Sequence, residues 1–170
     1  MFKWWVLLTL YLTQGLPHGF FSQALPTLLR QQGMSLEAIG LMSLVSLPWV
    51  LKFLWAPLLD HYQPLKRLTG GCIDGHIRKT WIISANAIAA LVLIFIASMP
   101  LEYWINQAAV GLACALLVLT VFVVTQDIAT DALAVENIPT AQRGFGNSLQ
   151  VAGYRIGMII GGGLLLAIFA

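Results

Sequence analysis

The chain alternates long apolar stretches with short polar ones. Five of the stretches are long enough to cross about 30 Å of hydrocarbon as helices, because a helix rises about 1.5 Å per residue. The pattern predicts an all-α membrane protein. Its five transmembrane helices are expected to span residues 4–29, 36–59, 80–99, 106–135 and 144–170.

The first apolar stretch begins like a secretory leader. Lys3 precedes it, and residues 22–24 are similar to a cleavage site with small residues. The stretch continues to Leu29 and further spans follow, which favours a transmembrane helix over a cleaved leader. Residues 14–19 and Pro26 interrupt it with proline, glycine and polar side chains. Such interruptions are tolerated beside other helices or a watery cavity, so we expect a broken helix that lines a cavity.

The polar segments differ in charge, and this difference orients the chain. The segment between Asp60 and Lys79 is rich in basic residues, whereas the segment after the third span holds Glu102 and no Lys or Arg. Basic loops stay on the cytoplasmic side of a membrane. We therefore expect a cytoplasmic amino terminus and a second cytoplasmic turn at residues 136–143. The basic residues of the first loop are Lys66, Arg67, Arg78 and Lys79.

Composition agrees with a membrane setting. Of the 170 residues, 59% are hydrophobic and 9% are charged, and the mean hydropathy is +0.83, whereas about a quarter of the residues in soluble domains are charged. The formal charge of +2 is too small to indicate nucleic-acid binding. Cys72 and Cys114 lie far apart and are expected to be free thiols. Neither a metal site nor the motifs of nucleotide-binding or hydrolytic enzymes are found, so we expect a non-enzymatic protein without a cofactor.

Two acids lie inside the otherwise apolar fourth span. Asp127 and Asp131 are four residues apart and so share one helix face. Charges at membrane depth are costly, and they usually mark pathways, proton relays or binding sites. An intramembrane aspartyl protease would need two facing carboxylates, and a spacing of one turn on one helix disfavours it. Asn147 and Gln150 follow on the fifth span, across a tight turn.

Arg155 is the deepest basic residue that the pattern predicts. It lies eleven residues beyond Gly144, or roughly 16 Å into the bilayer, which is near the midplane. Its guanidinium stays charged and must face acids, an anionic ligand or water. Two interpretations stay open: a structural ion pair with Asp127 or Asp131, and an arginine that faces the substrate.

A lone lysine, Lys52, lies within the second span. Its aliphatic stem can snorkel, so that the ammonium group reaches the polar end of the span near Asp60. Alternatively the side chain faces a cavity, where buried charge marks a functional site. Both interpretations stay open.

Three glycines in the fifth span recur at intervals of four residues. Gly153, Gly157 and Gly161 therefore lie on one helix face. That spacing is more typical of close helix packing than of a ligand site.

Four motifs stand out along the chain: QGLP at residues 14–17, KFLWAPLLD at 52–60, QDIATDA at 126–132, and Arg143-Gly144 followed by GYRIG at 153–157. Together they resemble the AmpG-related group of the major facilitator superfamily, and the resemblance covers nearly the whole chain. The group includes muropeptide permeases, RhtX/FptX siderophore importers and, more distantly, acetyl-CoA transporters. Residues 24–30 (ALPTLLR) lean slightly toward the siderophore branch.

The resemblance implies a gate at the cytoplasmic side. In the resembled family, the loop between the second and third helices contains an acid and basic residues. These residues pair with an acid at the cytoplasmic end of the fourth helix, and the pairing helps to stabilise the outward-facing state. Asp127 or Asp131 would be that acid here. The loop departs from the usual motif, because His61 and His76 stand where arginines are common. The proton-coupling or gating residues implied are Asp60, Arg78, Lys79, Asp127, Asp131 and Glu136.

The resemblance also implies a function. We expect a secondary permease of the bacterial inner membrane, coupled to protons, for a polar, anionic solute such as a siderophore or a muropeptide. Its partners would be the lipid bilayer, the solute and protons. The residues expected to line the solute cavity are Gln14, His18, Gln23, Lys52, Asn147, Gln150, Tyr154 and Arg155.

Length is the largest departure from the resembled family. Its permeases have twelve helices, in two six-helix halves that rock around a shared site. Five helices correspond to an incomplete amino-terminal half, which is expected to be inactive without the carboxy-terminal half. The alternative is a non-transporting membrane protein: a truncated remnant, or an assembly partner that packs through its glycine face.

Overall fold

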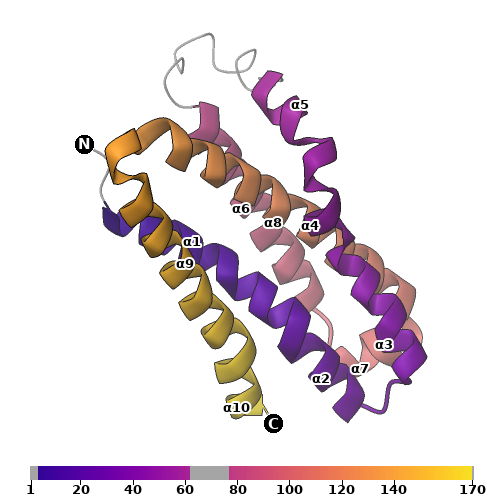
Figure 1. Cartoon of the computed structure of the whole chain (residues 1–170). Helices are drawn as coiled ribbons and strands as arrows, with labels where there is room; N and C mark the ends of the chain where they lie inside the picture. Colours follow the sequence, from indigo (N-terminus) through magenta and orange to yellow (C-terminus); the bar gives the residue numbers. More distant parts are fainter. Residues whose placement is uncertain (1–3, 62–76, 170) are drawn as a thin grey trace. The chain divides into compact units, whose positions relative to one another are not determined.

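The computed structural model describes residues 4–61 and 77–169, with the backbone alone at residues 60, 61, 77, 101 and 169. These residues are helical almost throughout (Figure 1), which confirms the predicted all-α class. The α-helices are α1 Trp4–Gly19, α2 Leu25–Gln31, α3 Leu36–Met42, α4 Leu47–Leu51, α5 Ala56–His61, α6 Ile77–Ala97, α7 Leu101–Gln107, α8 Ala109–Asn137, α9 Arg143–Met158 and α10 Leu165–Phe169.

The first span is one continuous helical segment rather than a broken one. Between α1 and α2 the chain forms a π-helical turn, Phe20–Ala24, in which the Leu25 N–H bonds the Phe20 carbonyl. Pro17 lies inside α1, and Pro26 lies at the second residue of α2, directly after the π-helical turn. The chain therefore changes its helical register at this point instead of breaking as predicted.

The second span is irregular. It begins after Ser35, whose Oγ accepts a hydrogen bond from the Ala38 N–H at 3.2 Å and so caps α3. A 3₁₀ turn at Ser43–Ser46 joins α3 to α4, and a second one follows α4 at Lys52–Leu54. The helical run ends there, earlier than the predicted residue 59, and α5 follows as a separate short helix.

A short helix occupies the predicted loop between the third and fourth spans. Pro100 stands at the start of α7 and Glu102 lies in its first turn, where an acid favours the helix dipole. The buried Trp104 donates a hydrogen bond from Nε1 to the Ile96 carbonyl at 2.9 Å and so ties α7 to the end of α6. Apolar periodicity did not reveal α7, because one half of this short helix is polar.

The fifth span also contains a π-helical turn. It covers Ile159–Leu164, between α9 and α10, and includes the run of three glycines. Like the first span, this segment continues without a break. The predicted boundary at residue 144 lies within one residue of the observed start of α9.

Four described helical segments are long and apolar enough to cross a membrane, whereas the sequence predicted five. The first segment, residues 4–31, is also long, but the polar side chains of Gln14, His18 and Gln23 reduce its apolar character. The four segments are Leu36–Leu54, Arg78–Ala97, Ala109–Asn137 and Thr140–Ile168.

By its contacts the chain divides into two compact units. Unit 1 comprises Met1–Leu44 and Ala134–Ala170, and unit 2 comprises Val45–Leu133. In unit 1, α1 and α9 lie side by side over most of their length (Figure 1). Its core cluster consists of Leu7, Tyr11, Ala134 and Ile138, with Trp4 and Leu149 packed against it.

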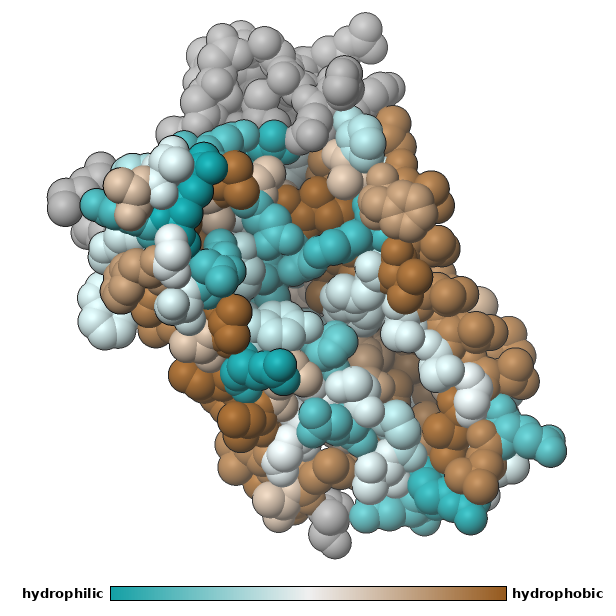
Figure 2. Space-filling model, in the orientation of Figure 1, coloured by the Kyte–Doolittle hydropathy of each residue, from teal (hydrophilic) through white to brown (hydrophobic). Residues whose placement is uncertain are grey.

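In unit 2, each long helix has buried residues along one of its faces. Along α6 the buried residues recur at helical spacing, and the same holds along α8. The part of the second span that lies in unit 2 exposes apolar side chains, as the brown surface over α4 and α5 shows in Figure 2. Such a surface suits contact with lipid. The buried residues include Ile82, Ala85 and Ala89 on α6, and Leu112, Leu116 and Leu119 on α8.

Candidate functional site

An ion-paired cluster lies inside unit 2. Lys52, at the start of a 3₁₀ turn, places its Nζ 3.0 Å from Asp127 Oδ2 and 3.6 Å from Asp131 Oδ2. The two aspartates stand one turn apart on α8, so a single ammonium group reaches both. We call Lys52, Asp127 and Asp131 the charged triad.

The structure gives Lys52 partners that the sequence did not assign to it. Its ammonium group is directed to two carboxylates of α8, and a cavity-facing role for Lys52 stays a prediction. The side chain of Asp60, the other expected neighbour, lies outside the described residues. A charge within a span costs least when paired with an opposite charge, and the triad satisfies that requirement.

Next to the triad, α8 buries a second polar pair. Gln126 Nε2 donates a hydrogen bond to Thr130 Oγ1 at 3.0 Å, and both side chains are almost fully buried. Sequence reasoning did not include either residue among the functional candidates. Their position within QDIATDA at residues 126–132, which supplies both carboxylates, could have indicated them.

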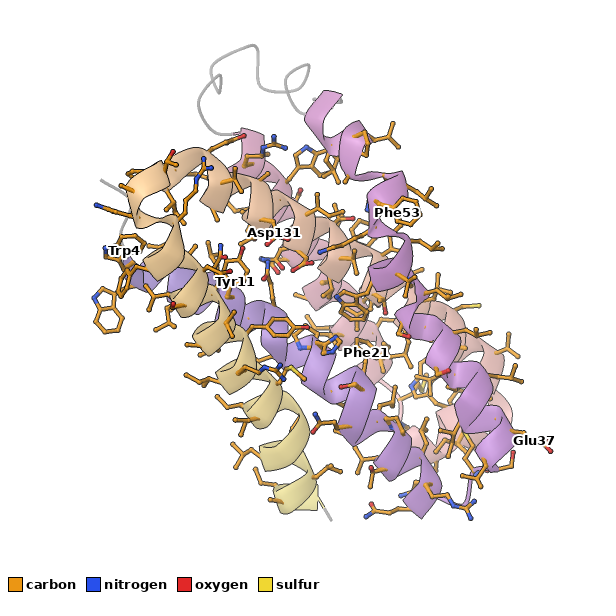
Figure 3. The ribbon with its side chains drawn as sticks, viewed as in Figure 1. Trp4, Tyr11, Phe21, Glu37, Phe53 and Asp131 are labelled. Atoms are coloured by element: carbon orange, nitrogen blue, oxygen red, sulfur yellow. The ribbon has the colours of Figure 1, made fainter. Side chains whose placement is uncertain are left out.

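Polar side chains also meet where α1 packs on α9 in unit 1. Gln150 Nε2 donates a hydrogen bond to the Tyr11 hydroxyl at 2.8 Å, and the rings of His18 and Tyr154 lie 5.6 Å apart. Gln14 is buried on the same side of α1 as Tyr11. The two contacts therefore involve three of the expected cavity residues, together with Tyr11. Tyr11 was not predicted, because a tyrosine among leucines resembles a core residue. Figure 3 shows Tyr11 in this region.

The other predicted cavity residues of unit 1 lie apart from these pairs. Gln23 is exposed in the first π-helical turn, and its side-chain oxygen lies against Gly162 in the second. Asn147 is exposed near the start of α9. The two π-helical turns pack on one another, so Gln23 stands where both helices change register.

Arg155 is exposed on α9. Among the described residues of unit 1 it forms no hydrogen bond or ion pair. It stands two residues from both Gly153 and Gly157, which places it on the opposite side of the helix from the glycine face. Its charge therefore points away from α1.

The glycine face lets the backbones of α1 and α9 approach closely. A Cβ at Gly157 would clash with the Leu12 carbonyl oxygen, and one at Gly161 would clash with the Leu16 carbonyl oxygen. At Gly153 the nearest atom, the Leu8 carbonyl oxygen, would be 2.7 Å away. Gly15 on α1 is equally confined, because a Cβ there would meet the backbone of α9. The contact requires glycine on both helices.

The residues predicted to form a gate are only partly described. Arg78 is half-buried at the start of α6, Lys79 beside it is exposed, and Glu136 is exposed near the end of α8. The basic loop, residues 62–76, lies outside the described residues together with Cys72. Cys114 is an exposed free thiol on α8, as predicted. The gating roles stay predictions.

Comparison with known proteins identifies the family. A family model described as acetyl-coenzyme A transporter 1 matches residues 3–169. The chain is 38% identical to an uncharacterized protein of Haemophilus influenzae over 160 residues, which are 92% of this chain and 34% of that protein. It is 35% identical to the anhydromuropeptide permease of Escherichia coli strain K12 over 162 residues, 95% of this chain and 30% of the permease.

The chain thus spans about a third of the length of the relatives it matches. No solved structure matches it. The matched family and the apolar helices agree with the resemblance carried by the four sequence motifs. This chain therefore belongs to the family of AmpG-like permeases, as an all-α membrane protein that fits the amino-terminal part of such a permease.

Proposed function

We propose that the chain forms part of a secondary active transporter that moves a polar, anionic solute across the bacterial inner membrane, coupled to protons. The observation that carries the proposal is the charged triad, held by an ion pair of 3.0 Å within otherwise apolar helices. Charge at such depth is retained when it serves a pathway, a relay or a binding site. The permease names among its relatives support the same class of function.

The carboxylates of the triad are the proposed proton sites. A proton that binds Asp127 or Asp131 removes one negative charge and weakens that carboxylate's hold on Lys52. Proton binding would therefore change which contacts hold the second span to α8. A change of that kind can shift a two-state equilibrium between outward-facing and inward-facing forms.

The polar residues of unit 1 are the proposed solute contacts. Gln14, His18, Gln150 and Tyr154 offer neutral donors and acceptors beside aromatic rings. Arg155 lies on the opposite side of α9 from the glycine face, so its planar cation would bind a carboxylate or phosphate of the solute apart from the residues of α1, through two parallel hydrogen bonds.

Two solute classes fit this chemistry. A muropeptide is supported by the name of the Escherichia coli relative. A siderophore is supported by the motif at residues 24–30. We favour the muropeptide, because it combines carboxylates with hydroxyl and amide groups that the polar residues of unit 1 complement.

The remaining helices of the transporter would come from a carboxy-terminal half, with the amino terminus of this chain in the cytoplasm. A second candidate function, an assembly partner that docks through its glycine face, is disfavoured by one observation. That face is already covered by α1 within the chain.

Uptake of a labelled anhydromuropeptide tests the proposed function. Cells that lack their own permease would express this chain alone, the carboxy-terminal half alone, or both together. We expect uptake only when both are present, and we expect a protonophore to abolish it. Equal background uptake in all three strains would contradict the proposal.

A further inference from the structure

The two carboxylates of the charged triad hold Lys52 unequally. Asp127 lies 3.0 Å from the ammonium nitrogen and its side chain is 13% exposed, whereas Asp131 lies 3.6 Å away and is 44% exposed. Short, enclosed ion pairs are held more firmly than long, open ones. Asp127 is therefore the fixed partner of Lys52, and Asp131 is the weaker one.

Lys52 itself is open to an incoming group. Its side chain remains 41% exposed although it contacts both acids. The side chains of Lys52 and of Asp131, its more exposed partner, thus both keep surface that another group can contact.

The balance of charge favours an exchange at this position. The triad contains one ammonium group and two carboxylates. If a solute carboxylate replaces Asp131 at Lys52, the ammonium group keeps two negative neighbours, and a proton that binds the displaced Asp131 keeps that carboxylate from being left as an unpaired charge. An exchange of like for like avoids the large cost of exposing a lone charge within a span.

We propose that Asp131 is an internal substitute for the solute: without solute it occupies the position at Lys52 that a carboxylate of the solute takes during transport. Lys52 is then the residue that recognises this carboxylate, and Asp127 is the positioning residue that holds the ammonium group in place. The inference rests on the proposed transport function and adds to it a binding position and the chemical group bound there.

The proposal is tested by the preference of the complete permease for a carboxylate. The KM for uptake would be measured with an anhydromuropeptide and with the same compound carrying its carboxylates as amides. The ratio of the two KM values reports recognition of the negative charge. Unlike uptake alone, the ratio does not depend on the amount of permease in the membrane.

Asp131→Asn removes the competing carboxylate. We expect it to lower the ratio of the KM for the acid to the KM for the amide by about two- to fivefold, as fits the loss of a half-exposed competitor. Lys52→Gln combined with Asp127→Asn removes the ammonium group without leaving a buried charge, and should bring the ratio close to one. Glu102→Gln, an exposed acid on α7 of the same unit, is the matched control and should keep the wild-type ratio.

A ratio of the KM for the acid to the KM for the amide that is unchanged or raised in Asp131→Asn would overturn the proposal, as would a wild-type ratio in the double variant. A failure of the proposed transport function would give a different result from a failure of this inference. The wild-type permease would then take up neither the acid nor the amide, and this is seen before any variant is measured.

Discussion

Lys52 and Asp127 stand 75 residues apart in the chain, yet their side chains meet at 3.0 Å. The contact fastens the irregular second span to α8 and places a cation and an anion within two helical segments that are apolar enough to cross a membrane. Loss of one partner leaves the other without its nearest opposite charge.

Removal of Lys52 should therefore destabilise the chain, and removal of Asp127 as well should restore it. We expect Lys52→Met to lower stability by about 1–2 kcal/mol, less than for a fully buried pair because Lys52 is 41% exposed. Lys52→Met with Asp127→Asn should recover most of the loss. Thermal melting of the purified chain in detergent measures both, and equal melting temperatures for the single variant and the wild type would speak against the pair.

The glycine contact between α1 and α9 predicts a contrast between two alanine substitutions. Gly157→Ala would drive a methyl group into the Leu12 carbonyl oxygen, so the helices must separate at a cost of about 1–3 kcal/mol or more. Gly163→Ala is the matched control, because nothing lies within 4 Å of a Cβ there. The melting temperature in detergent should be lowered by Gly157→Ala and nearly unchanged by Gly163→Ala. Similar melting temperatures for the two variants would contradict the close approach of the α1 and α9 backbones.

Cysteine labelling tests the predicted topology. In a Cys114→Ser background, Cys72 in the basic loop should resist an impermeant thiol reagent added outside intact cells. Ser98→Cys, placed in the exposed turn after α6, should react readily in the same background. The opposite result at both positions would invert the orientation.

Arg155 is expected to matter for transport and little for folding. It forms no hydrogen bond or ion pair among the described residues of unit 1, so Arg155→Ala should leave membrane abundance of the complete permease near normal while uptake is lost. Arg155→Lys keeps the charge but loses the two-pronged geometry, and should raise KM by roughly tenfold. An alanine variant with low abundance that recovers on neutralising Asp127 or Asp131 would indicate an ion pair instead.

Helical class was predictable from the sequence because it depends on long apolar runs, which any spanning helix needs. The π-helical turns could not be predicted from the sequence. Their residues, Phe20–Ala24 and Ile159–Leu164, keep nearly the same apolar pattern as an α-helix. Pro17 suggested a break, but neighbouring backbone contacts keep the first span helical through it.

The candidate site was predictable in its residue types and less so in its pairing. The spacing of Asp127 and Asp131 placed both on one face of a helix, as α8 shows. The partner of Lys52 was ambiguous, because snorkelling and ion pairing use the same residue in the same span. Only the fold brings residue 52 to α8, and only the fold distinguishes Tyr11 from an ordinary core tyrosine.

Proton coupling through the triad is the central claim. Its most direct test uses the complete permease in proteoliposomes with an imposed pH gradient, acidic on the side from which an anhydromuropeptide is supplied. The wild type should concentrate the solute, whereas Asp127→Asn should exchange solute across the membrane without concentrating it, because it lacks a proton-binding carboxylate. If Asp127→Asn and Asp131→Asn both concentrate the solute as the wild type does, the triad does not couple protons to transport.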